Sequence, residues 1–203
     1  MHSVTVKGQR VYPSKIVCVG RNYVEHIKEL GNEVPDHMVV FNKPNSALTN
    51  TLHARLGEPL HYEGELAFAI ENGTIAAVGF GLDLTKRGLQ SSLKKKGLPW
   101  ERAKAFDGAA LLGAFVALPP VIETLSLRLT VDGATRQAGG VDLMMYKPAT
   151  IVTELRQFMS LEDGDIIMTG TPAGVGVVQA GECFVGQVLA DQEILVEANW
   201  TAV

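Results

Sequence analysis

Two glutamates stand one residue apart at the start of an apolar segment, HYEGELAFAI, which runs from His61 to Ile70. In an extended strand alternate side chains share a face, so Glu63 and Glu65 point the same way. With alternate Cα atoms about 7 Å apart and an effective dielectric constant of about 20, their charges repel by about 2 kcal/mol. A hard divalent cation would remove this repulsion. A strand end exposed to water would also tolerate it, and the stretch alone leaves both interpretations open.

The same alternation separates the two faces of this segment. On the glutamate face the next two residues are small, Ala67 and Ala69, so we expect open space above them. The opposite face is the expected core face and carries the large apolar residues Tyr62, Leu66, Phe68 and Ile70.

A third acidic residue, Asp83, lies at the end of the strand-like run VGFGLDL, just before the longest expected helix. An aspartate at that place can cap the helix, and this is the simpler interpretation of Asp83 alone. Together with Glu63 and Glu65, however, it supplies an all-oxygen donor set suited to Mg²⁺ or Mn²⁺. The sequence has no cluster of cysteine and histidine at zinc-ligand spacing, which favours the same kind of metal.

His26 and Glu29 stand three residues apart in RNYVEHIKELG, where a helix is expected. Residues i and i+3 share a helix face, so the carboxylate can orient the imidazole and raise its basicity. Such a pair suits a general base that takes a proton from water, and a surface ion pair of little consequence is the alternative. Because Gly20 and Gly31 flank the segment, we hypothesise that it moves as a lid.

Two further stretches carry groups that suit anions. Lys104 lies among small and apolar residues in RAKAFDG, either as a partly buried ammonium near an oxyanion or as a side chain that reaches solvent. The stretch TGTPAGVG, from Thr169 to Gly176, has the glycines and hydroxyls of an anion-binding turn but lacks a P-loop ending. A tight connection between strands is the alternative.

The elements that must position these residues are mostly short strands, separated by Gly, Pro, Asn and Asp turn signals. Three helices are expected, from Tyr23 to Leu30, from about Thr85 to Lys96 and from Ala149 to Met159. Strand and helix patterns do not alternate regularly, which disfavours a doubly wound sheet. We therefore predict one β-rich α+β domain over residues 1–203.

Length and composition argue against several classes of function. The 203 residues are 46% hydrophobic and carry a formal net charge of -4 without an acidic or basic block, which disfavours nucleic acid or a membrane as partner. The chain shows no apolar segment of signal-peptide length at its start, and its longest apolar run, GAALLGAFVALPPVI, is too short to span a bilayer. A cytoplasmic protein is expected.

Taken in order, these motifs resemble the fumarylacetoacetate hydrolase superfamily, most closely its short, single-domain branch of acylpyruvate hydrolases and oxaloacetate decarboxylases. The matching stretches cover nearly the full chain: CVGRNYVEHIKELG, the Lys-Pro of FNKP, HYEGEL, GLDLTKRGLQ, KKKGLPWERAKAFDG and GDIIMTGTPAGVG. The resemblance implies a mixed β-sandwich roll of the type found in the C-terminal domain of fumarylacetoacetate hydrolase, with a few short helices, and a homodimer.

The resemblance also implies residue roles. The implied site residues are the Mg²⁺ or Mn²⁺ ligands Glu63, Glu65 and Asp83, the water-activating pair His26 and Glu29 with the assisting cation Lys104, and the substrate contacts Arg87, Gln90 and Thr171. The implied substrate is a small diketo or oxo acid.

The reaction expected from this set is metal-dependent hydrolysis of the C–C bond of an acylpyruvate, giving pyruvate and a carboxylic acid. Oxaloacetate decarboxylation and isomerisation of a hydroxydienoate are alternatives on the same site, because each also needs a stabilised enolate. The water-activating pair His26 and Glu29 favours hydrolysis, since a decarboxylase needs no nucleophilic water. A non-catalytic, metal-stabilised binding domain is the alternative from another class, and the presence of His26, Glu29 and Lys104 argues against it.

Overall fold

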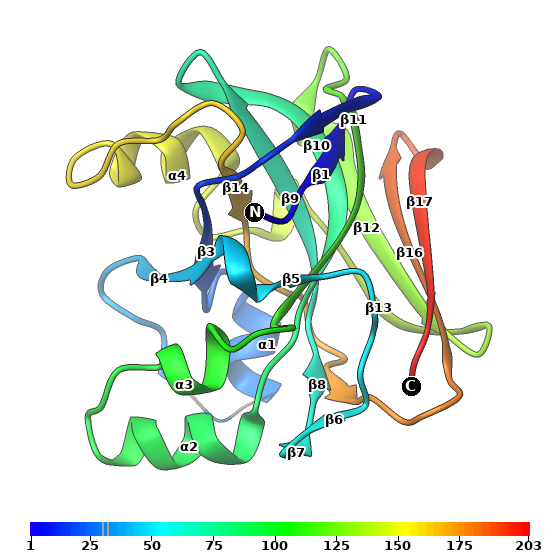
Figure 1. Cartoon of the computed structure of the whole chain (residues 1–203). Helices are drawn as coiled ribbons and strands as arrows, with labels where there is room; N and C mark the ends of the chain where they lie inside the picture. Colours follow the sequence, from blue (N-terminus) through cyan, green and yellow to red (C-terminus); the bar gives the residue numbers. More distant parts are fainter. Residues whose placement is uncertain (30, 32) are drawn as a thin grey trace.

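The computed structural model describes residues 1–29, 31 and 33–203 and contains two main β-sheets that pack face to face (Figure 1). The strands of the larger sheet are β1 Val4–Val6, β2 Gln9–Val11, β3 Lys15–Gly20, β4 Val39–Pro44, β5 Leu48–Thr49, β9 Gly64–Glu71, β10 Thr74–Asp83, β11 Ala110–Ala117 and β14 Ile166–Met168. They follow the order β2-β1-β11-β10-β9-β14-β3-β4, with β5 beside β11. The β-rich α+β class predicted from the sequence is confirmed.

The smaller sheet has the order β13-β12-β16-β17. Its strands are β12 Leu125–Val131, β13 Ala134–Gly140, β16 Cys183–Ala190 and β17 Glu193–Thr201. Two short strand pairs complete the described strands: β6 Arg55–Leu56 with β7 Glu58–Pro59, and β8 His61–Tyr62 with β15 Gly176–Val177.

The main core lies between the two sheets. Phe68 of β9 and Phe80 of β10 pack there with Leu129 and Phe184 of the smaller sheet, all of them fully buried. Burial of each such side chain contributes about 1.5–3 kcal/mol. Gly186 allows the sheets to approach, because a Cβ at that position would lie 2.1 Å from the ring of Phe80.

The opposite face of β9 is buried as well, which corrects the expectation of open space above Ala67 and Ala69. Both alanines pack with Ile16, Phe115 and Met168 in a second apolar cluster. Because the nine-stranded sheet curls, its own strands β3, β11 and β14 supply the residues that cover this face.

The hairpin of β9 and β10 decides which residue lies opposite Glu63. Asn72–Gly73 form its two-residue turn with φ angles of +52° and +71°, as in a type I′ turn. A bulge at Ala76 then shifts the register by one residue, so that the N–H of Asp83 donates to the carbonyl of Glu63 at 2.9 Å. Without the bulge, Leu82 would stand opposite Glu63.

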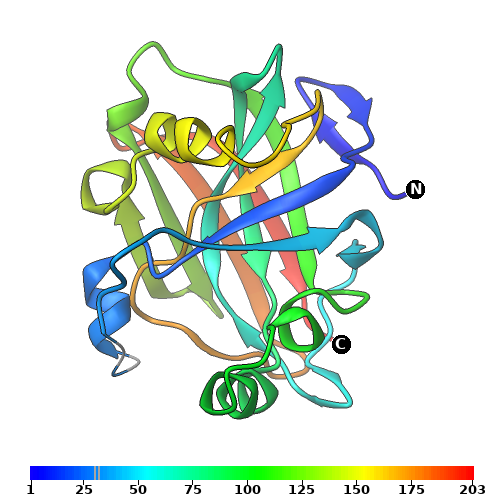
Figure 2. The same ribbon diagram turned by 90° about the vertical axis from the view of Figure 1, so that its left-hand side faces the viewer.

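The helices of the described residues are α1 Val24–Glu29, α2 Arg87–Lys95, α3 Glu101–Lys104 and α4 Pro148–Leu155. The first, second and fourth confirm the expected helices. The first and second are shorter than expected, and the fourth begins one residue earlier and ends four residues earlier than expected. Leu30, the expected end of the first, lies outside the described residues. The helix α3 was not expected. Helices α2 and α3 lie beside each other at one end of the molecule, and α1 lies apart from them in Figure 2. The helix α4 covers β3 and β14 (Figures 1 and 2). Within the described chain, no helix has both the length and the apolar content to cross a membrane.

Candidate active site

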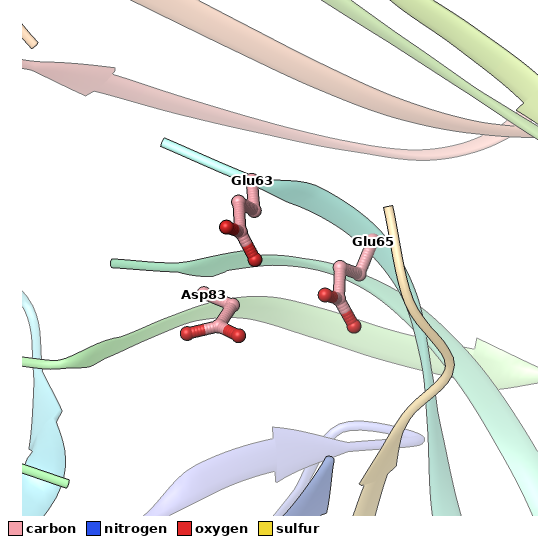
Figure 3. Close-up of side chains that lie close together, drawn as sticks. All are labelled: Glu63, Glu65 and Asp83. Carbon is pink, nitrogen blue, oxygen red and sulfur yellow. The ribbon is translucent and has the colours of Figure 1, made fainter. Parts of the chain in front are cut away.

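Three carboxylates meet where β9 begins and β10 ends. Glu63 joins β8 to β9, Glu65 lies on β9, and Asp83 is the last residue of β10. Each offers an oxygen atom, and these atoms lie within 4.8 Å of one another. Figure 3 shows the three carboxyl groups close together on neighbouring strands. We call these three residues the carboxylate triad.

Burial of the carboxylate triad contradicts two simpler interpretations. A solvated strand end is wrong, because Glu63 is only 6% exposed and Glu65 only 2%. A helix cap is also wrong for Asp83, since α2 has Lys86 as its N-cap residue and no side-chain cap bond. The acidic residues are therefore part of a buried polar centre.

The ammonium group of Lys104 lies between two of the carboxylates. Its Nζ atom donates hydrogen bonds to Glu63 Oε2 at 2.7 Å, to Asp83 Oδ2 at 2.6 Å and to Thr85 Oγ1 at 2.7 Å. The side chain is 3% exposed, so a lysine that reaches solvent is wrong. All three ammonium donors are in use, and Lys104 therefore balances the charge of the triad directly.

A second buried lysine was missed by reasoning from the sequence. The Nζ atom of Lys43, on β4, lies 2.7 Å from Asp83 Oδ1 and donates to the backbone carbonyl of Lys104. Despite this contact, Asp83 Oδ1 accepts no hydrogen bond of normal geometry. The motif FNKP gave the only sequence signal for Lys43, and it did not indicate the partner.

Burial and neighbouring charges shift the pKa values of Glu63 and Glu65 in opposite directions. Burial by itself would raise the pKa of Glu63, but the positive charges of Lys104 and Arg87 outweigh it and hold that pKa well below its ordinary value. Burial and the neighbouring carboxylates raise the pKa of Glu65 well above its ordinary value, and the N–H of Gly170, 2.8 Å from Oε2, opposes them only in part. The negative charge on Glu65 thus lacks a strong partner among the described residues.

The triad fits a hard divalent cation. Its donors are all oxygens, and they lie within 4.8 Å of one another. A cation would also compensate the charge of Glu65. Because Lys104 lies between Glu63 and Asp83, binding requires its ammonium to shift or the carboxylates to use their other lone pairs.

His26 and Glu29 come together on α1. The Nδ1 atom of His26 lies 3.1 Å from Glu29 Oε2. The His26 side chain is buried and lines the pocket, whereas the Glu29 side chain is 32% exposed, so the pair is only partly at the surface. The other Glu29 oxygen, Oε1, accepts the N–H of Gly174 at 3.0 Å. This contact connects α1 to the glycine-rich turn after β14. With Nδ1 directed at a carboxylate, Nε2 is the ring nitrogen available to accept a proton.

One pocket contains the triad, His26 and the three expected substrate contacts. Arg87 donates to Gln90 Oε1 at 2.7 Å and also to Glu63. Thr171 donates its hydroxyl to the carbonyl of Gly64 at 2.9 Å. The structure thus brings all the sequence-predicted site residues to the same place.

Gln137, on β13, is a buried residue that the sequence reasoning did not single out. Its Oε1 atom accepts the N–H of Gly64 at 2.8 Å, and its Nε2 atom donates to Thr171 Oγ1 at 2.7 Å. The amide therefore holds the residue between the two triad glutamates against the turn that carries Thr171. A single glutamine in a strand gives no sequence signal for such a role.

Comparison with known proteins gives concordant matches. The sequence profile of the fumarylacetoacetate hydrolase C-terminal domain matches residues 15–198. The oxaloacetate tautomerase YcgM of Escherichia coli is 40% identical over 191 residues, which are 84% of this chain and 87% of that protein. The mitochondrial oxaloacetate tautomerase oaa1 of Schizosaccharomyces pombe is 36% identical over 199 residues, 88% of this chain and 90% of that protein. Because the second relative is mitochondrial, a cytoplasmic location stays a prediction for this chain.

A solved structure gives a similar result. Fumarylpyruvate hydrolase from Pseudomonas aeruginosa, in complex with Mn²⁺ and pyruvate, matches with a TM-score of 0.87 and 32% sequence identity. The match covers 100% of this chain and 95% of that one. The family resemblance and the fold type expected from the sequence motifs are confirmed.

Proposed function

The chain belongs to the fumarylacetoacetate hydrolase family of enzymes, and we propose that it interconverts the keto and enol forms of oxaloacetate with a divalent metal ion. The proposal is supported by the buried carboxylate triad, which shares a pocket with His26, in a chain 40% identical to an oxaloacetate tautomerase. The proposal differs from the hydrolysis expected from the sequence, which stays a prediction.

Glu63, Glu65 and Asp83 are the proposed ligands of Mg²⁺ or Mn²⁺. A cation held by them would stabilise the negative charge that develops on the 2-oxygen of the substrate. The all-oxygen donor set and its burial support this assignment, and the fumarylpyruvate hydrolase relative contains Mn²⁺.

His26 is the proposed base. Tautomerisation moves one proton between C3 of oxaloacetate and the oxygen on C2. The Nε2 atom of His26 takes the proton from C3 of the keto form. The protonated imidazole then returns a proton to the C2 oxygen, directly or through a water molecule, which gives the enol and restores neutral His26. Glu29, anchored by Gly174, keeps the proton of the imidazole on Nδ1, so that Nε2 stays a base.

Lys104 has a proposed electrostatic role. Its three donors are already bonded to Glu63, Asp83 and Thr85, so it acts on the charge of the triad more directly than on the substrate. Its positive charge keeps Glu63 ionised, which a metal ligand requires.

Hydrolysis of an acylpyruvate is the second candidate function, and it would use the same two residues, His26 and Glu29. A histidine that accepts a proton from C3 would also accept one from a water molecule directed at the distal carbonyl. Decarboxylation of oxaloacetate needs the same stabilisation of negative charge but no base. The role of His26 therefore separates decarboxylation from the other two reactions.

Three assays on the purified protein separate these reactions: decay of enol oxaloacetate, pyruvate release from oxaloacetate and pyruvate release from acetylpyruvate. Each is run with Mg²⁺ and again with excess chelator. The proposal predicts chelator-sensitive acceleration of enol decay that exceeds both rates of pyruvate release. Chelator-sensitive pyruvate release from acetylpyruvate without faster enol decay would move the assignment to a hydrolase. Ligand binding without any turnover would indicate a binding domain.

A further inference from the structure

Basic side chains line the part of the pocket that faces solvent. Arg21, Arg87 and Lys94 share the pocket with the carboxylate triad. Arg21 and Lys94 are half-buried, whereas the triad is fully buried, so these two cations lie nearer the solvent. Arg87 already bonds Glu63, but the guanidinium of Arg21 makes no hydrogen bond or ion pair within the described part of the chain.

The backbone of Arg21 adopts an unfavourable conformation. Its φ angle is +56°, in the left-handed region that costs a residue with a side chain about 1–2 kcal/mol. Strain of this kind persists only where the surroundings enforce it, and it concentrates at functional sites. The conformation therefore requires surroundings that hold the backbone of Arg21 in place.

The anchor is Asn22, whose side chain is completely buried. Its amide donates to the carbonyls of Thr169 at 2.8 Å and Tyr146 at 3.0 Å, and its Oδ1 atom accepts the N–H of Tyr146 at 2.7 Å. The carbonyl of Asn22 also accepts the N–H of Met145 at 2.9 Å. These bonds fix the chain after β3 to two other loops, so the backbone of Arg21 has a defined position at the pocket.

The charges around Lys94 show that these cations are close enough to affect one another. Burial lowers the pKa of Lys94, and the positive charges of Arg21 and Arg87 lower it further. An anion bound among the three would relieve this repulsion. A carboxylate suits the planar guanidinium of Arg21, which can donate two parallel hydrogen bonds to it.

We propose that Arg21 and Lys94 bind the distal carboxylate of a dianionic 2-oxo acid whose other end lies at the carboxylate triad. This inference rests on the proposed function and defines its substrate class. Oxaloacetate carries the required second carboxylate, whereas a monoanionic acylpyruvate such as acetylpyruvate does not. Arg21 and Lys94 are therefore the residues that select oxo diacids.

The test compares oxaloacetate with its 4-methyl ester, which keeps the 2-oxo acid but lacks the distal charge. Calorimetric titration in Mg²⁺ gives the affinity for each ligand, and enol decay gives kcat/KM for each. The wild type is expected to bind the diacid at least about 10-fold more tightly than the ester. Loss of one charged pair corresponds to about 10- to 100-fold in affinity.

Arg21→Met is expected to lose about 10- to 100-fold in affinity for the diacid while the ester is unaffected. Arg21→Gly removes the same charge and suits the left-handed backbone, so it is expected to fold and to give the same result. Lys94→Met is expected to reduce diacid affinity too. Lys95→Met, which changes an exposed neighbour that does not line the pocket, is the matched control and should change neither affinity.

The inference is overturned if the wild type binds both ligands equally well or if both Arg21 variants weaken both ligands by the same factor. Binding and turnover are read separately. A diacid preference that Arg21→Gly abolishes, without any accelerated enol decay, would support the inference and refute the proposed reaction. Accelerated enol decay together with an unchanged preference for the diacid in the Arg21 variants would support the proposed reaction and refute the inference about Arg21.

Discussion

Replacement of Lys104 by methionine is expected to make the stability of the protein depend on divalent cations. Methionine, like lysine, has an unbranched side chain, but it carries no charge, so the variant mainly loses the ammonium group. That group is buried and donates to Glu63, Asp83 and Thr85 at 2.6–2.7 Å. Without it, the ion-pair partners left to the triad among the described residues are Lys43 and Arg87.

The size of the effect follows from these contacts. Removing one partner of a buried ion pair costs about 3–5 kcal/mol, because the remaining charge is left uncompensated. Lys43 and Arg87 still contact Asp83 and Glu63, so we expect the lower end, about 3 kcal/mol, when no divalent cation is present. Bound Mg²⁺ would supply the missing positive charge. Recovery of about 2 kcal/mol corresponds to about 30-fold tighter metal binding than in the wild type.

The assay is urea unfolding of wild type and Lys104→Met, once with excess chelator and once with saturating Mg²⁺. Lys95→Met removes an exposed lysine from α2 and is expected to stay within about 0.5 kcal/mol of the wild type. A loss below about 1 kcal/mol in chelator, or an equal loss with and without Mg²⁺, would refute the reasoning that Lys104 and a metal ion compensate the same carboxylates.

Further variants test the other groups. Glu63→Gln is expected to abolish metal-dependent turnover, and full activity at limiting Mg²⁺ would exclude Glu63 as a ligand. His26→Ala is expected to slow enol decay by about 100-fold or more while decarboxylation of oxaloacetate changes little; an equal loss of both would show that His26 only shapes the pocket. Burial opposes ionisation of Asp165, but hydrogen bonds from Lys15 and Ser14 outweigh it and lower its pKa below the ordinary 3.8. Asp165→Asn should therefore cost about 1–3 kcal/mol in urea unfolding above pH 5, and its deficit should shrink as acid protonates Asp165 in the wild type below pH 3.8; a deficit that does not change with pH would contradict this.

The strand pattern was sufficient to predict that Glu63 and Glu65 share a face, because the two-residue period of a strand is a local property. The position of Asp83 opposite Glu63 depends also on the turn and on the register of the β9–β10 hairpin. The turn Asn72–Gly73 is readable as a hairpin signal, but the bulge at Ala76 is not, and it is the bulge that exchanges Leu82 for Asp83 opposite Glu63.

Features that depend on distant contacts could not be predicted. Ala67 and Ala69 face a second core because the large sheet curls over them, and small side chains in a strand do not reveal what covers them. Lys43 becomes a partner of Asp83 only through the arrangement of β4 beside the site. The helix α3, Glu101–Lys104, is too short to show a helical period, although it carries Lys104.

A titration of metal-free protein with Mn²⁺ tests whether the carboxylate triad is a catalytic metal site. Bound metal and the rate of enol-to-keto conversion of oxaloacetate are measured in the same samples. The rate is expected to rise in proportion to occupancy of one ion per chain and to return to the uncatalysed value when chelator removes the ion. Glu65→Gln is also expected to lose both metal affinity and rate. Full activity of the metal-free protein, or Mn²⁺ binding that is unchanged in Glu65→Gln, would contradict the proposal that the carboxylate triad is a catalytic metal site.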